Sequence, residues 1–153
     1  MITFEELLNR DGMLVYKTKG VSMEPMLRQN RDLVIIRTTS VRLKKYDVAL
    51  YKRGNEYVLH RVIDVKNGYY LFRGDNTYAL ENVPDKAVLG ILTGFQRKGK
   101  KHDVSAMGYC LYARIWSAIY PLRKLYLHAY LKIRNVSGKL GIIPLIKRLV
   151  RHD

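Results

Sequence analysis

The fold is decided by the stretch Tyr57–Arg73, which reads YVLHRVIDVKNGYYLFR. Two runs rich in β-branched and aromatic residues flank an Asn67-Gly68 pair. Asn-Gly between such runs is the strongest short-range signal of a β-hairpin. The stretch therefore predicts two antiparallel strands, at residues 57–65 and 69–73.

Outside this hairpin, further short runs of the same character predict additional strands, at residues 13–19, 33–37, 48–52 and 88–95. A capping box beginning at Thr3 predicts a short helix before the first of them, ending near Gly12. Closely spaced strands joined by tight turns indicate a mainly β fold, an antiparallel barrel-like β domain with a short N-terminal helix.

Charge and composition divide the 153-residue chain into two parts. Residues 1–95 contain 15 Lys and Arg against 11 Asp and Glu, whereas residues 96–153 contain 13 against 2. After Gln96-Arg97-Lys98, interpreted as a turn or linker, the pattern becomes helical and aromatic-rich. We therefore expect a β catalytic domain at 1–95 and a basic, aromatic-rich helical C-terminal extension at 96–153.

The extension predicts an anionic partner, either the surface of an anionic membrane or, less favoured, a nucleic acid. Its Tyr and Trp residues suit a membrane interface and suit packing on the β domain equally well. The most apolar segment, 106–122, is interrupted by Arg114 and Pro121, so it is expected to lie on a surface rather than to cross a membrane.

No signal peptide is expected, since acidic and basic residues interrupt the N-terminal apolar run. The predicted location is the cytoplasm, with peripheral association at the inner face of the membrane. No metal or other cofactor is expected either. The chain has a single cysteine, Cys110, and its histidines do not cluster with it at a metal-ligand spacing.

Three residues form a candidate catalytic set: Ser22, His60 and Asp75. A serine hydroxyl needs a base to remove its proton, and a histidine is suited to that task near neutral pH. A carboxylate can fix the tautomer of the histidine. Taken singly, each residue is more typical of a loop, a strand position or a turn, so the ordered set carries the hypothesis.

Five ordered segments and Asp32 strengthen this hypothesis. The segments are Gly20-Val21-Ser22-Met23-Glu24-Pro25-Met26-Leu27, Tyr46-Asp47-Val48, Val58-Leu59-His60-Arg61-Val62, Arg73-Gly74-Asp75-Asn76 and the run from Gly90 to Gly94, and Asp32 lies between the first and the second. Together they resemble the type I signal peptidase and LexA-like serine peptidase superfamily. The resemblance is strongest to small bacterial signal-peptidase-like proteins without an N-terminal membrane anchor. Their tails carry a Tyr-x-Leu-Tyr-x-Arg-x-Trp pattern, found here at residues 109–116.

The resemblance implies that Ser22 is the nucleophile and that His60 is the general base, at a position where most bacterial enzymes carry lysine. It places Asp75 on the acidic motif of the family and leaves Glu81 or Asp85 as a second acid. Gly20 stands where the family often has a serine that helps to hold the oxyanion. Backbone N–H groups near Ser22 would then carry most of that role.

These observations predict a serine endopeptidase that cleaves a leader or precursor peptide by a Ser-His mechanism with an assisting Asp75. The main alternative is a non-catalytic binding module with the peptidase fold, whose basic extension binds an anionic membrane or nucleic acid. A LexA-like self-processing regulator is a third reading. It lacks support because the chain has no convincing cleavage site of the Ala-Gly or Cys-Gly type.

Overall fold

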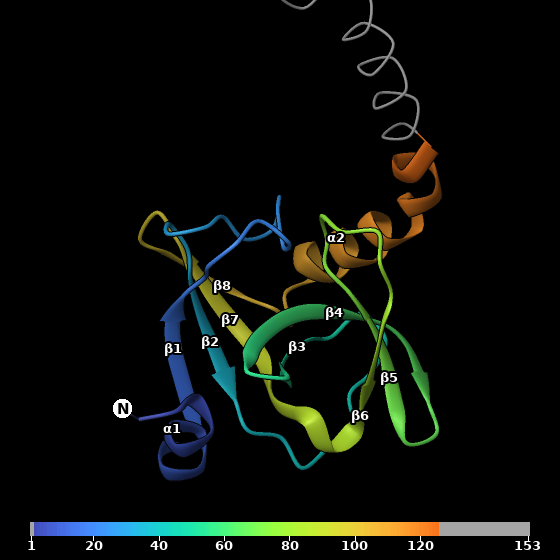
Figure 1. The fold of residues 1–153 in the computed structure, drawn as a ribbon. Helices are drawn as coiled ribbons and strands as arrows, with labels where there is room; N and C mark the ends of the chain where they lie inside the picture. Colours follow the sequence, from blue (N-terminus) through green and yellow to red (C-terminus); the bar gives the residue numbers. More distant parts are fainter. Residues whose placement is uncertain (1, 126–153) are drawn as a thin grey trace, which may run out of the picture. The chain divides into compact units, whose positions relative to one another are not determined.

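Figure 1 shows the computed structural model of the protein, which describes residues 2–125. The fold is mainly β: an antiparallel sheet curls into a half-barrel, with a short helix at the N-terminal side and a helix after the last strand. The predicted fold class is therefore confirmed. The helices expected after residue 125 lie outside the described residues.

The described part of the chain contains two α-helices, eight strands and one short 3₁₀ helix. In chain order they are α1 (Phe4–Asp11), β1 (Met13–Lys17), β2 (Leu33–Arg37), β3 (Val48–Arg53), β4 (Glu56–Lys66), β5 (Tyr69–Arg73), β6 (Glu81–Pro84), η1 (Asp85–Ala87), β7 (Val88–Arg97), β8 (Lys100–Asp103) and α2 (Met107–Ala118).

The strands follow one another in the sheet in the order β1-β2-β7-β3-β4-β5-β6, and β8 pairs with β7. All of the pairings are antiparallel. The predicted hairpin at 57–73 is confirmed as β4–β5, and the predicted capping box at Thr3 is present. Strands β6 and β8 were not predicted, because each is four residues long and carries no alternating apolar pattern.

Strand β3 separates two hydrophobic cores. Val48 and Leu50 pack into the core beneath α1, whereas Ala49 and Tyr51 pack into the core against β5 and β6. All four are buried. This alternation follows from the strand geometry, because successive side chains point to opposite faces.

The compact unit that holds this sheet runs from Met1 to Ser117, and a second unit covers Ala118–Asp153. The domain boundary predicted after residue 95 therefore falls inside β7, and the β7–β8 hairpin and most of α2 belong to the first unit. The reason is packing: Val104, Tyr109 and Tyr112 lie against the core of the β domain. Within residues 2–125, no helix has the length and apolar character needed to span a bilayer.

Gly90 on β7 is predicted to be essential for close packing of the sheet. A Cβ atom there would lie 2.6 Å from the carbonyl oxygen of Arg37 and 2.8 Å from Cγ2 of Ile36. Gly90→Ala should therefore lower the free energy of unfolding by about 2 kcal/mol or more in chemical denaturation. Gly108→Ala is the matched control, because a Cβ atom at Gly108 meets nothing within 4 Å. Equal stability of the two variants would contradict this account.

Candidate active site

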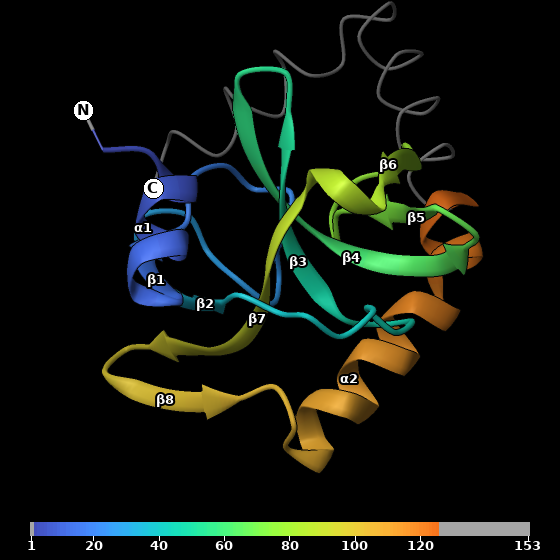
Figure 2. The same cartoon turned by 90° about the horizontal axis from the view of Figure 1, so that it is seen from below.

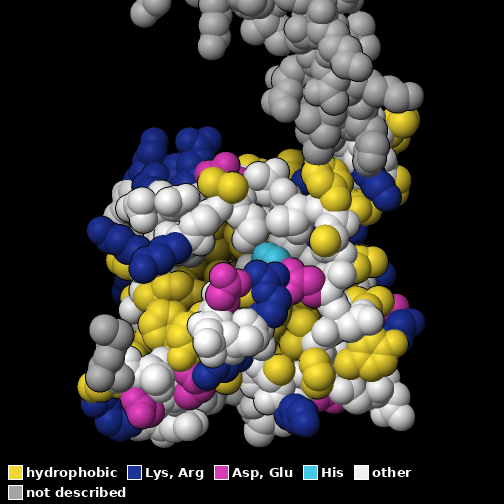
Figure 3. Space-filling model, viewed as in Figure 1, with side chains coloured by type: hydrophobic (Ala, Val, Ile, Leu, Met, Phe, Trp, Pro, Cys, Tyr) yellow, Lys and Arg dark blue, Asp and Glu magenta, His cyan; other side chains and the backbone are white. Residues whose placement is uncertain are grey.

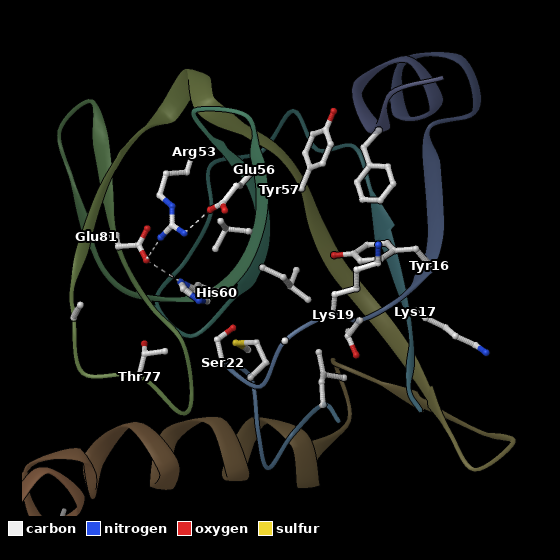
Figure 4. Close-up of a pocket in the computed structure, with 18 residues that line it drawn as sticks. Tyr16, Lys17, Lys19, Ser22, Arg53, Glu56, Tyr57, His60, Thr77 and Glu81 are labelled. Carbon is white, nitrogen blue, oxygen red and sulfur yellow. Dashed lines mark hydrogen bonds and ion pairs between the residues drawn. The ribbon is translucent and has the colours of Figure 1, made fainter. Parts of the chain in front are cut away.

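A cavity of about 930 Å³ opens between β1 and the strands β3, β4 and β6 (Figure 4). Its wall near α1 is aromatic, formed by Phe4, Tyr16 and Tyr57. On the face shown in Figure 3, a histidine side chain is visible in the hollow beside acidic and basic groups. Ser22 and His60 both line this cavity.

Ser22 lies in the loop between β1 and β2, and the Gly74-Asp75-Asn76 turn holds it in place. The N–H of Asn76 donates to the carbonyl of Ser22 at 2.7 Å. The side-chain amide of Asn76 donates to the carbonyl of Val21 at 3.2 Å. The next residue, Met23, is buried in the core. The loop is therefore anchored on both sides of the serine, which is itself half-buried at the cavity wall.

Gly74 allows Ser22 and His60 to approach each other. A Cβ atom at Gly74 would lie 2.6 Å from the carbonyl oxygen of Ser22 and 3.0 Å from Nε2 of His60. Figure 4 shows the two side chains next to each other at the base of the cavity. Within the described residues no hydrogen bond joins the Ser22 hydroxyl to His60. Such contacts are often long in a free enzyme and tighten around the substrate.

The other ring nitrogen of His60 is held by Tyr51 and Glu81. Nδ1 lies 3.1 Å from the Tyr51 hydroxyl and 3.4 Å from Oε1 of Glu81. The Tyr51 hydroxyl donates to Oε2 of Glu81 at 2.9 Å, so its oxygen is free to accept a hydrogen bond from Nδ1–H. This arrangement favours the tautomer in which Nε2 carries the lone pair and faces the cavity.

Burial lowers the pKa of His60 below its ordinary value of 6.5. Glu81 opposes this shift, Arg53 adds to it, and Asp75 opposes it more weakly than Glu81 does. Arg53 in turn binds Glu81 at 3.0 Å and Glu56 at 2.8 Å. His60 is therefore neutral at pH 7 and able to accept a proton.

Asp75 has a different partner from the one expected. Arg61 binds both of its carboxylate oxygens at 2.8 Å, and the carboxylate that faces Nδ1 of His60 is Glu81. The physical reason is strand geometry: His60 and Arg61 are neighbours on β4 and point to opposite faces of the sheet. Asp75 lies on the Arg61 face, whereas Glu81, one of the two second acids left open by the sequence, lies beside His60.

The Arg61–Asp75 pair links the turn that holds the Ser22 loop to α2. Arg61 is fully buried, with 0 % of its surface exposed, and its guanidinium also reaches the carbonyl of Tyr46 and the sulfur of Met26. Three aromatic residues on one face of α2 close over the pair: Tyr109 accepts from Arg61, Tyr112 donates to the Asp75 carboxylate, and Trp116 donates to the Asp75 carbonyl. These aromatic side chains therefore pack on the β domain.

Two backbone N–H groups of the Ser22 loop are not used by the fold. Those of Ser22 and Met23 donate to no other group among the described residues, so they could serve as hydrogen-bond donors to a bound group. Gly20 has a φ of 80°, a left-handed conformation that disfavours a serine side chain. The absence of a hydroxyl there thus agrees with the backbone of this loop.

Tyr51 and Arg53 were not among the residues predicted for the site, although the sequence carries a signal for Tyr51. The turn signal at Arg53-Gly54-Asn55 sets the β3–β4 register, in which Ala49 lies opposite His60. Tyr51, two residues after Ala49, therefore lies on the same face as His60.

In comparisons with known proteins, no protein-family model matches this sequence and no curated protein is significantly similar to it.

Glu81 and Arg53 are predicted to shift the pKa of His60 in opposite directions. Glu81→Gln removes a negative charge near the ring and should lower the pKa further, whereas Arg53→Met should raise it. Both values can be measured by NMR titration of the His60 ring. Unchanged pKa values in both variants would show that neither group acts on His60.

The Arg61–Asp75 pair is predicted to be critical for stability. Arg61→Met leaves the Asp75 carboxylate buried without its main partner, which should lower the free energy of unfolding by about 3–5 kcal/mol. Arg53→Met breaks ion pairs whose arginine is 53 % exposed and should cost below about 1 kcal/mol. Chemical denaturation measures the free energy of unfolding of both variants. A loss for Arg61→Met as small as that for Arg53→Met would show that the Arg61–Asp75 pair is not critical for stability.

Proposed function

We propose that the protein is a serine endopeptidase of the signal-peptidase type that cleaves a leader or precursor peptide. The observation that supports this best is the meeting of Ser22 and His60 around Gly74 at the base of the cavity, with Nδ1 of His60 held by Tyr51 and Glu81. A nucleophile, a base and a group that orients the base are the parts that acyl transfer requires.

In the proposed reaction, the Ser22 hydroxyl attacks the carbonyl carbon of the scissile peptide bond, and its proton passes to Nε2 of His60. The N–H groups of Ser22 and Met23 stabilise the negative oxygen that develops. His60 then donates the proton to the departing amine, which leaves an ester on Ser22. A water molecule, deprotonated by His60, hydrolyses this ester and restores the serine.

The imidazolium formed during attack is stabilised by Glu81, whose carboxylate lies on the Nδ1 side of the ring. Because the pKa of His60 is lowered, the base is already neutral at pH 7. Cleavage should therefore fall as the pH drops through the pKa of His60 and should level off above it.

The substrate is proposed to bind as an extended strand along β1. This strand stands at the end of the sheet order, so one of its edges has no partner strand within the described residues. Its last residue, Lys17, and residues 18–20 after it line the cavity that leads to Ser22. An extended peptide can pair with such an edge through main-chain hydrogen bonds.

We also propose that the basic C-terminal region holds the protein at an anionic surface. Residues 96–153 carry 13 Lys and Arg against 2 Asp and Glu, which favours lipid headgroups or nucleic acid as the partner.

Cleavage of a proteome-derived peptide library tests the peptidase proposal, with the new termini identified by mass spectrometry. Wild-type protein should produce new termini, and Ser22→Ala and His60→Ala should reduce cleavage by about 1000-fold or more, since the two residues act as a unit. Glu81→Gln should reduce it by about 100-fold or more through loss of orientation.

Ser40→Ala is the matched control, because Ser40 is an exposed loop serine outside the cavity. Cleavage by Ser40→Ala at the wild-type rate is expected. If wild type and Ser22→Ala give identical terminus profiles, the peptidase proposal fails and the non-catalytic binding module takes its place.

A further inference from the structure

Helix α2 exposes a row of large apolar side chains on the side away from the sheet. Met107, Leu111 and Ile115 are spaced four residues apart, so they lie along one face of the helix. Their side chains are 87 %, 57 % and 50 % exposed, respectively. We refer to these three residues as the outer stripe.

The opposite face of α2 is already occupied. Tyr109, Tyr112 and Trp116 point to the β domain and contact the Arg61–Asp75 pair, as described above. Helix α2 is therefore apolar on two faces, and Arg114 is its only charged residue. A surface helix of a globular protein normally presents a polar face to water, so the outer stripe indicates a second apolar contact.

The charges around α2 indicate what makes that contact. Residues 96–125 contain seven Lys and Arg and one acidic residue, Asp103. Three of the lysines, Lys98, Lys100 and Lys101, are exposed on the β7–β8 hairpin. Figure 2 shows β8 and α2 along the same side of the β domain. Exposed apolar side chains on α2 and exposed lysines on the β7–β8 hairpin, along the same side of the β domain, match a bilayer with anionic headgroups. A nucleic acid offers phosphates for the lysines but no apolar interior that would bury the outer stripe.

We propose that the outer stripe of α2 inserts into the interface of an anionic lipid bilayer, with the lysines of the β7–β8 hairpin on the headgroups. This inference rests on the association with an anionic surface proposed above, and it identifies both the lipid and the contacting face.

The docked orientation places the catalytic groups near the membrane. The inner face of α2 contacts Asp75, which adjoins Gly74 between Ser22 and His60. A helix with its side chains is about 10 Å across, so the thickness of α2 and the turn at Gly74-Asp75-Asn76 together separate Ser22 from the lipid surface. Peptide bonds that emerge close to a membrane are then the ones within reach.

Vesicle binding by the full chain tests the proposal. The binding partners are vesicles of phosphatidylglycerol and phosphatidylcholine in equal parts, and phosphatidylcholine alone. The variant Met107→Ser/Leu111→Ser/Ile115→Ser keeps every charge and should bind the anionic vesicles about 100-fold more weakly, since each side chain contributes burial of apolar surface. The control Ile2→Ser/Val15→Ser/Val41→Ser removes three exposed apolar side chains outside α2 and should bind like wild type.

Cys110 provides a second, independent readout, because it is the single cysteine of the chain and lies exposed on α2. A polarity-sensitive dye on Cys110 should shift its emission to the blue on anionic vesicles in wild type and should not shift in the stripe variant. Retention of the thermal unfolding midpoint would confirm that the stripe variant is folded.

Each contrary outcome is distinct. Vesicle binding that is equal in wild type and the stripe variant, or that leaves the dye unshifted, overturns the role of α2 while the charge-driven association stands. If the protein binds no vesicles, a lipid bilayer is not its partner. Salt-dependent binding to duplex DNA would then identify a nucleic acid as the partner, and self-association that is lost in the stripe variant would identify a second copy of the chain. None of these outcomes depends on cleavage, so Ser22→Ala should bind vesicles like wild type.

Discussion

A guanidinium without access to water needs fixed acceptors, and in this protein Asp75 supplies them for Arg61. The pair joins β4, the turn after β5 and α2 within a single hydrogen-bonded cluster. Because the same turn holds the Ser22 carbonyl through Asn76, the position of the serine depends on this buried ion pair. The position of the Ser22 loop at the base of the cavity therefore depends on the pairing of the buried Arg61 charge with Asp75.

The alternation of side chains along β4 divides the polar residues into two groups with separate tasks. Arg61 faces Asp75 and α2, and that group holds the structure together. His60 faces Tyr51 and Glu81, and that group sets the tautomer and the pKa of the ring. Gly74 lets Ser22 and His60 approach each other, since any side chain there would collide with the Ser22 carbonyl and the His60 ring.

Most of the β fold was predictable, because hairpin turns and β-branched runs are local signals; β6 and β8 were missed since their short polar sequences carry none. Ser22 and His60 were predicted from motifs, and the structure brings them together. The partner of His60 was not predictable by order along the chain. Choosing Glu81 over Asp75 depends on which face of the sheet each acid reaches, and that requires the tertiary fold.

The central claim is that Ser22 is a nucleophile activated by His60. Covalent labelling with serine-acylating probes, a phosphonate and a β-lactone, tests it most directly when the modified residue is located by tandem mass spectrometry. The account predicts a single adduct on Ser22, formed faster as the pH rises through the pKa of His60 and nearly absent in His60→Gln. Labelling of Ser22 at the same rate in folded His60→Gln, or no adduct on Ser22 in folded wild-type protein, would contradict it.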